Sequence, residues 1–154
     1  MFTSFVSGGG GGESSVNAIR PVTKITTDAP VLTKEEHSNH IIMINHVSAV
    51  TTMDLPAVAD AVGMTLTIVM NLALTADCVI DGQANDKIRH LDFNTTDTAA
   101  NIGRWTEGRY LTYDESLGSG GNGNIGDYVH LFCDGSYWHA TSFAQSSRVW
   151  GAAD

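Results

Sequence analysis

The stretch 126–141, GDYVHLFCDGSYWHAT, constrains the fold more than any other part of the chain. It consists of two short apolar runs, both rich in aromatic residues, joined by Asp134-Gly135. An Asp-Gly pair between two such runs is the strongest short-range signal for a β-hairpin with a two-residue type I′ turn. We therefore predict two antiparallel strands that meet at Asp134 and Gly135.

The first strand of this hairpin carries apolar bulk on both faces, because alternate residues of a strand point to opposite sides. One face is formed by Val129, Leu131 and Cys133, and the other by Tyr128, His130 and Phe132. A strand at the surface of a monomer would alternate more cleanly between apolar and polar residues. We therefore expect burial on both faces, either within a sandwich or against another subunit. Trp138, after the turn, is expected in the core, with a sugar-stacking platform as the alternative.

Short apolar or alternating runs recur along the rest of the chain, with turn signals between them. This pattern predicts an all-β fold, a compact antiparallel β-sandwich or barrel of jelly-roll type. A single helical turn is expected over Pro56–Val62, with Pro56 at its first position and Gly63 as its end. The other predicted strands are 22–26, 31–33, 41–44, 47–55, 64–70, 78–80, 87–93 and 105–113.

The first twenty residues differ in composition from the remainder, which we interpret as a single β-domain over 21–154. Five consecutive glycines, Gly8–Gly12, follow the apolar residues Phe2, Phe5 and Val6. Glycine loses the most backbone entropy on ordering, so this run predicts a flexible tether. Residues 1–20 are either a disordered terminus or an arm whose apolar anchors become ordered on a partner surface.

The charge balance excludes some classes of partner. The formal net charge is −9, from 17 acidic and 8 basic residues. This opposes binding to nucleic acid, which needs clustered basic side chains, and binding to an anionic membrane surface. We expect no transmembrane segment and no signal peptide, because the apolar stretches are too short. Cys78 and Cys133 lie in apolar runs and are expected to be buried free thiols, with a disulfide as the alternative.

Two groups of polar residues resemble metal sites without meeting their requirements. His37, His40 and His46 lie on both sides of an apolar strand, where three ligands would not converge, so surface or cross-strand histidines are favoured. The loop Asp81–Asp86 offers oxygen ligands but lacks the full calcium-loop pattern, so a β-turn is favoured. We expect no metal and no cofactor.

No arrangement of residues identifies an active site. The chain has no Gly-x-Ser-x-Gly motif, and the glycines around Ser119 are not followed by Lys and Ser or Thr as in a phosphate loop. Asp114 and Glu115 could be paired by folding, but nothing distinguishes them from solvated loop acids. We expect no catalytic residues and no enzymatic activity.

A family resemblance is carried by several short segments taken together. They are the apolar strand Ile41–Ile44, the Thr-Met-Asp-Leu-Pro sequence at 52–56, the strand 64–70, Val79–Gly82, and IGDYVHL followed by DGSYW within 125–138. Over Thr26–Ser142 the chain resembles a module of tailed-bacteriophage virion proteins, of the capsid decoration (cement) and head- or tail-fibre types.

This resemblance implies a structural protein of the virion rather than an enzyme. It implies a compact β-domain that forms a homotrimer, binds the major capsid protein on the outer capsid surface and stabilises the head after assembly in the host cytoplasm. The capsid-binding role of Phe2, Phe5 and Val6 is our inference. We likewise infer that Tyr128, His130, Phe132 and Trp138 form the trimer or core strand.

The alternative function is a receptor- or glycan-binding head- or tail-fibre tip. Such a tip would use exposed aromatic rings as a sugar-stacking surface. The candidates for that surface are Trp105, Tyr110, Tyr113 and Trp150.

Overall fold

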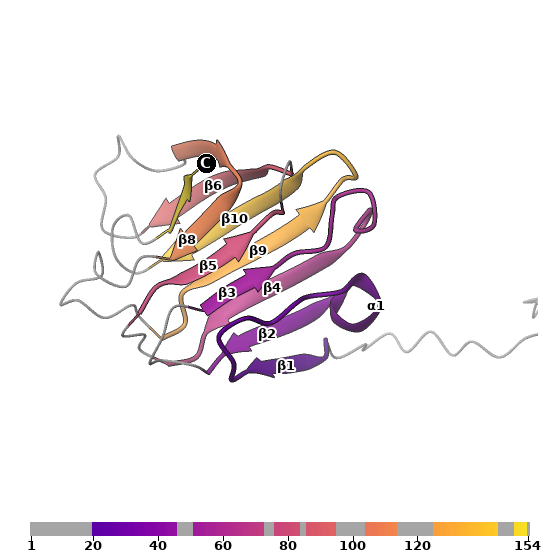
Figure 1. Cartoon of the computed structure of the whole chain (residues 1–154). Coiled ribbons are helices and arrows are strands. Elements are labelled where there is room, and N and C mark those ends of the chain that lie inside the picture. Colours follow the sequence, from indigo (N-terminus) through magenta and orange to yellow (C-terminus); the bar gives the residue numbers. More distant parts are fainter. Residues whose placement is uncertain are drawn as a thin grey trace, which may run out of the picture.

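The chain forms two β-sheets packed on either side of one apolar core (Figure 1). The computed structural model describes residues 20–45, 51–72, 76–83, 86–94, 104–113, 125–144 and 150–153. In spatial order the seven-stranded sheet contains β1 (Val22–Ile25), β2 (His40–Ile44), β4 (Thr65–Met70), β9 (Tyr128–Cys133), β10 (Trp138–Ala144), β6 (Ile88–Asn94) and β7 (Arg104–Gly108). The four-stranded sheet contains β11 (Trp150–Ala153), β8 (Tyr110–Tyr113), β5 (Cys78–Asp81) and β3 (Thr51–Asp54). The predicted all-β sandwich class is thus confirmed.

The core lies between the sheets and is built from alternate residues of their strands. In β4, Leu66, Ile68 and Met70 are fully buried while the residues between them are half-buried, as the sequence alternation predicts. Trp138 is the largest fully buried side chain, and its indole N–H donates to the carbonyl oxygen of Pro56 at 3.2 Å. The prediction that Trp138 belongs to the core is confirmed.

The prediction of a purely antiparallel arrangement is wrong, because both sheets are mixed. The parallel pairs are β1–β2, β2–β4, β3–β5 and β6–β10. From β2 to β6 the chain alternates between the two sheets with each successive strand. A strand that returns to its sheet after such a circuit runs in the same direction as the strand that left, so β2 and β4 are parallel, and so are β3 and β5.

The predicted hairpin is present, but its turn is not of the predicted type. β9 and β10 pair antiparallel with Cys133 opposite Trp138. Gly135 has φ 94°, whereas neither Asp134 nor Ser136 has a positive φ, so a type I′ turn centred on Asp134 and Gly135 is wrong. The Asp134 carboxylate instead accepts the backbone N–H groups of Ser136 and Tyr137 at 2.7 and 2.8 Å, which closes the turn through a side chain.

The only helix in the described part of the chain is α1 (Lys34–His37), which lies between the predicted strands 31–33 and 41–44. Thr33 caps it, accepting the N–H of Glu36 on its hydroxyl at 3.3 Å. The Thr-x-x-Glu spacing of Thr33 and Glu36 is a capping-box signal that the prediction overlooked. Over 56–62, where a helical turn was predicted, the chain forms hydrogen-bonded turns but no helix. The Ala61 N–H donates to the Ala57 carbonyl at 3.0 Å.

The predicted strand 105–113 is two strands, because the chain passes from one sheet to the other at Arg109. β7 pairs with β6 in the larger sheet, and β8 pairs with β5 in the smaller one. Arg109 forms two hydrogen bonds to the Asp81 carboxylate, at 2.8 and 2.7 Å, which hold the pKa of Asp81 below its usual range. The carbonyl of Arg109 accepts the N–H of Gly82 at 3.0 Å, so this corner is fixed by both backbone and side chain.

Two smaller predictions concern the cysteines and residues 31–33. Cys78 and Cys133 are buried and free, and burial raises the pKa of Cys78 to about 12, so its thiol is inert. Instead of a separate strand over 31–33, residues 28–32 run beside β3, with the N–H of Leu32 on the Asp54 carbonyl at 2.9 Å. β11 was not predicted at all.

Candidate interaction surface

The outer side of the seven-stranded sheet exposes large aromatic side chains. Tyr128, Phe132 and Phe143 are 39%, 40% and 39% exposed. They are surrounded on neighbouring strands by half-buried apolar residues that point the same way. We call this surface the aromatic face, and it comprises Ile41, Met43, Val69, Leu91, Phe93, Tyr128, Phe132 and Phe143.

The expectation that β9 is buried on both faces within a sandwich is wrong for the single chain. Val129, Leu131 and Cys133 are fully buried, whereas Tyr128 and Phe132 on the other face remain exposed. The larger sheet has the smaller sheet on one side only, and nothing in the described chain covers the other side (Figure 1). Burial against another subunit, the second alternative, stays a prediction.

Strand register gathers five residues of the aromatic face into a continuous row, whereas Phe132 lies beyond the polar row of Thr67, His130 and Thr141. Met43 is paired with Val69, Val69 with Tyr128, Tyr128 with Phe143, and Phe143 with Phe93. The rings of Tyr128 and Phe143 stack with centroids 5.8 Å apart and an angle of 16° between their planes. Because cross-strand neighbours on one face pack together, five strands contribute to one apolar strip.

A row of hydrogen-bonded polar groups borders this strip, starting at Arg20, the first described residue. Its guanidinium donates to the Thr67 hydroxyl at 2.9 Å and to the carbonyl oxygens of Asn39 and His40 at 3.2 and 3.0 Å. The same Thr67 hydroxyl lies 3.1 Å from Nδ1 of His130. Partial burial, and then the charge of Arg20, lower the pKa of His130, which favours its neutral form.

The opposite border of the aromatic face contains charged groups that are tied to one another. Phe132 stacks against His139 with centroids 6.2 Å apart, and His139 Nε2 lies 2.7 Å from the Asp134 carboxylate. This contact and the two turn N–H groups lower the pKa of Asp134 to about 2. Arg89 lies over the ring of Tyr137, 3.4 Å from its centroid. The border is thus polar and held in place, as the rim of an interface is.

The phenylalanines are distributed in a way that the composition alone does not reveal. The chain has five, and none of the three that the structure describes contributes to the buried core. Phe93, Phe132 and Phe143 lie on the aromatic face, whereas Phe2 and Phe5 lie outside the described residues, as does Val6. Phenylalanine is normally among the residues most often buried. Its position here indicates that the outer face is suited to a contact.

A buried polar cluster lies on the inner side of the same sheet. His90 Nε2 is 2.7 Å from the Ser142 hydroxyl, which donates to the Asp92 carboxylate at 2.6 Å. Since Ser142 donates to Asp92, Nε2–H of His90 must donate to Ser142, leaving Nδ1 to accept from Thr106 at 3.4 Å. Burial lowers the pKa of His90 to about 4, so it is neutral near pH 7.

This cluster contains serine, histidine and aspartate but is not arranged for nucleophilic catalysis. In a catalytic triad the serine gives its proton to the histidine, and the aspartate orients the histidine. Here the hydroxyl of Ser142 points to Asp92, and Ser142 has no exposed surface. The cluster is therefore an internal polar contact between β6 and β10.

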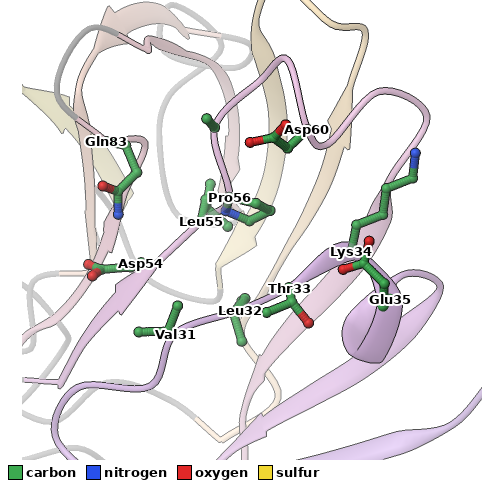
Figure 2. A pocket seen from close by; sticks show the side chains of 11 residues that line it. Val31, Leu32, Thr33, Lys34, Glu35, Asp54, Leu55, Pro56, Asp60 and Gln83 are labelled. Carbon is green, nitrogen blue, oxygen red and sulfur yellow. The ribbon is translucent and has the colours of Figure 1, made fainter.

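An open groove lies where the segment preceding α1 runs beside β3, on the other side of the molecule from the aromatic face. Its volume is about 680 Å³. Figure 2 shows that Lys34, Glu35 and Asp60 line one side and that Asp54 and Gln83 line another. Lys34 donates to the Val62 carbonyl at 2.8 Å, so its ammonium is already bonded. The acidic side chains do not converge on one point, and the groove is weaker than the aromatic face as a candidate site.

The structure separates the residues that the sequence had suggested as metal ligands. His37 Nδ1 accepts the N–H of Thr33 at 3.1 Å, and His40 Nδ1 contacts the Thr23 hydroxyl at 2.9 Å, while His46 lies outside the described residues. Asp81 is bonded to Arg109. Within the described ranges, no group of three or more histidine, cysteine or acidic side chains could hold a metal ion.

The aromatic residues of the glycan-binding alternative do not form one surface in the part that is described. Tyr113 is fully buried, and its hydroxyl donates to Asp127 at 2.8 Å. Tyr110 is half-buried with the Arg109 guanidinium 4.6 Å from its ring centroid. Trp105 lies in β7 and Trp150 in β11, but their side chains are outside the description. Asp114 and Glu115 are outside it as well.

Among the described residues, no helix is long and apolar enough to cross a membrane. Comparisons of the chain with protein-family models, with curated proteins and with solved structures find no match.

Proposed function

We propose that this protein is a structural subunit of a bacteriophage virion, a decoration protein that binds the major capsid protein on the outer surface of the head. The observation that carries the proposal is the aromatic face, a set of exposed rings and half-buried apolar residues on a sheet surface that the described chain leaves uncovered. The sequence resemblance over 26–142 supplies the class of particle. An exposed apolar surface with a polar rim is typical of a protein–protein contact.

The proposal assigns the aromatic face to contact between copies or with the capsid. Tyr128, at the centre of the strip, and Phe132, on the other side of the His130 row, are the residues expected to lose most exposed surface when this contact forms. The homotrimer implied by the resemblance would make this contact three times at each position where it binds the capsid. Repetition raises the strength of binding without any new type of contact.

The direct test is sedimentation of the purified protein with expanded capsids. The wild type is expected to sediment with the capsids in a fixed ratio to the capsid protein. A double variant, Tyr128→Ser with Phe132→Ser, is expected to lose most of this binding. Val31→Thr is the matched control, because Val31 is 65% exposed but lies on the edge of the other sheet.

Two outcomes would contradict the proposal. One is equal capsid binding by the wild type and the double variant. The other is failure of the wild type to bind capsids together with specific binding to host cells or glycans, which would favour the fibre-tip alternative. Analytical ultracentrifugation of the same samples tests the trimer separately.

A further inference from the structure

The N-terminal segment enters the described fold beside the aromatic face. Arg20 precedes Pro21 and β1, and its guanidinium lies on the outer side of the larger sheet, bonded to Thr67 of β4. Val22 and Lys24 of β1 are exposed on this same side. Residues 1–19 are therefore joined to the fold at a fixed point on the rim of the surface that carries Tyr128, Phe132 and Phe143.

The distance from this point to the aromatic rings suits the length of the connection. From β1 the sheet continues through β2 and β4 to β9 (Figure 1), which is three strand spacings or about 14 Å. Tyr128 lies four residues along β9 from Phe132, so the farther ring is about 20 Å from Arg20. Arg20 lies fourteen residues after Val6, and the connection between them includes Gly8–Gly12. A glycine-rich connection of this length has an r.m.s. reach of about 19–22 Å.

This agreement favours contact within one chain. The effective concentration of a tethered group is highest when the r.m.s. length of its tether matches the span that it must cover. Full extension would reach about 46–50 Å, so the connection is not strained at the distance required. A second copy would have to compete with a segment that is already held beside the surface.

The chemistry of the two parts also matches. Apart from the three phenylalanines on the aromatic face, the chain has only Phe2 and Phe5, which lie close to Val6 on the N-terminal side of the glycine run. Offset or edge-to-face packing of such rings on Tyr128 and Phe143 adds to the gain from apolar burial. Glu13 is the only acidic or basic side chain in residues 1–19, so desolvating the apolar end does not bury a charged side chain.

We propose that Phe2, Phe5 and Val6 bind the aromatic face of their own chain in the free protein. The docking does not rest on the proposed function.

The docking is tested by paramagnetic relaxation in the unassembled protein. A nitroxide attached to Ser4→Cys would place the probe between the two phenylalanines. The native thiols do not compete for the label, because Cys78 and Cys133 are buried and their pKa values are raised. Amide signals of Tyr128, His130 and Phe143 are expected to fall by more than half relative to the reduced sample. Signals from β3 and β5 in the other sheet should stay unchanged.

Two matched samples make the result specific. In the first, Phe2→Ser, Phe5→Ser and Val6→Ser are added to the labelled chain, and the loss of signal at Tyr128 is expected to be at least several-fold smaller. In the second, labelled chain without ¹⁵N is mixed with ¹⁵N chain without label, and no effect is expected.

The inference is overturned if the labelled wild-type segment leaves Tyr128 and Phe143 unaffected, if the serine variants behave like wild type, or if relaxation arises in the mixed sample. The last result would assign the face to the segment of a second copy. These outcomes are independent of capsid binding. Relaxation without capsid sedimentation would overturn only the proposed function, and sedimentation without relaxation would overturn only the docking.

Discussion

The two faces of the seven-stranded sheet are built by the same strands but from different residues. Inward positions of β4 and β9 hold aliphatic side chains, such as Leu66 and Leu131, that are fully buried. Outward positions hold rings, such as Tyr128 and Phe132, that keep about two fifths of their surface exposed. Both faces are apolar, so hydrophobicity alone does not tell which of them the chain itself covers.

The difference concerns when the apolar surface is buried. Full burial of a large apolar side chain contributes about 1.5–3 kcal/mol. The inward side chains gain this on folding, whereas Tyr128 and Phe132 can gain their remaining part only when something covers them. The inner face should therefore determine stability and the outer face should determine association.

The largest effect is expected at the inner face, from Trp138→Ala. Removal of a fully buried indole leaves a cavity and an unpaired carbonyl on Pro56. Such a change costs about 3–5 kcal/mol of the free energy of unfolding, as measured by urea denaturation. Trp138→Phe should cost clearly less, because most of the volume is kept. A loss below about 1 kcal/mol for Trp138→Ala would contradict the assignment of this face as the core.

The second effect is a pH dependence to which the buried His90 on the inner face is expected to contribute. The pKa of His90 is lowered from 6.5 to about 4 in the folded chain. Between these values the unfolded chain binds a proton that the folded chain does not, so stability falls as the pH falls from 6.5 to 4. The pKa shift corresponds to roughly 3 kcal/mol.

Urea denaturation at pH 7 and pH 4.5 measures this dependence. The variant His90→Gln should show a smaller loss of stability between the two values, since it cannot take up the proton. Val31→Thr, at an exposed position without a titratable side chain, is the control and should retain the wild-type slope. Equal slopes for His90→Gln and the wild type would show that the buried cluster is not the source.

The sequence predicted the elements of the inner face well, because burial leaves a periodic signal. The alternation in 64–70 and the apolar run 41–44 lie in β4 and β2, and Trp138 is in the core. It could not predict that neighbouring strands are parallel, because the crossing of the chain between sheets has no local pattern. β11 was missed for a related reason, since Trp150–Ala153 contains only one β-favouring side chain and depends on pairing with β8.

The outer face was only half predicted. The sequence identified β9 as apolar on both sides, but it could not tell whether the second side is covered within the chain. Phe143 and Phe93 join that surface through strand register, which brings β10 and β6 together from distant parts of the chain. Arg109 looked like part of one strand because nothing local distinguishes a residue at which the chain changes sheets.

A third, smaller effect compares two arginines in different surroundings. Arg109 holds Asp81, which is 7% exposed, at the corner between the sheets, while Arg89 holds the more exposed Glu107 on the outer side. Lysine cannot reproduce the two-pronged contact of Arg109 with a carboxylate. Arg109→Lys should therefore lower the free energy of unfolding more than Arg89→Lys does. Arg89→Lys should cost less than about 1 kcal/mol, as exposed pairs do. If urea denaturation gave equal losses for the two variants, the Arg109 contact would not differ in strength from the more exposed Arg89 contact.

The smallest effect on stability, and the sharpest test of the comparison, is expected for Phe132→Thr. Threonine is also suited to a strand, so β9 keeps its pairing while the exposed ring is removed. The free energy of unfolding should change by no more than about 1 kcal/mol, because the ring is already 40% exposed and its burial is incomplete. Capsid sedimentation should nevertheless fall strongly, whereas Val31→Thr should alter neither quantity. A loss of stability as large as that of Trp138→Ala would mean that the outer ring belongs to the fold rather than to a contact. The expectation that the inner face determines stability and the outer face determines association would then be wrong.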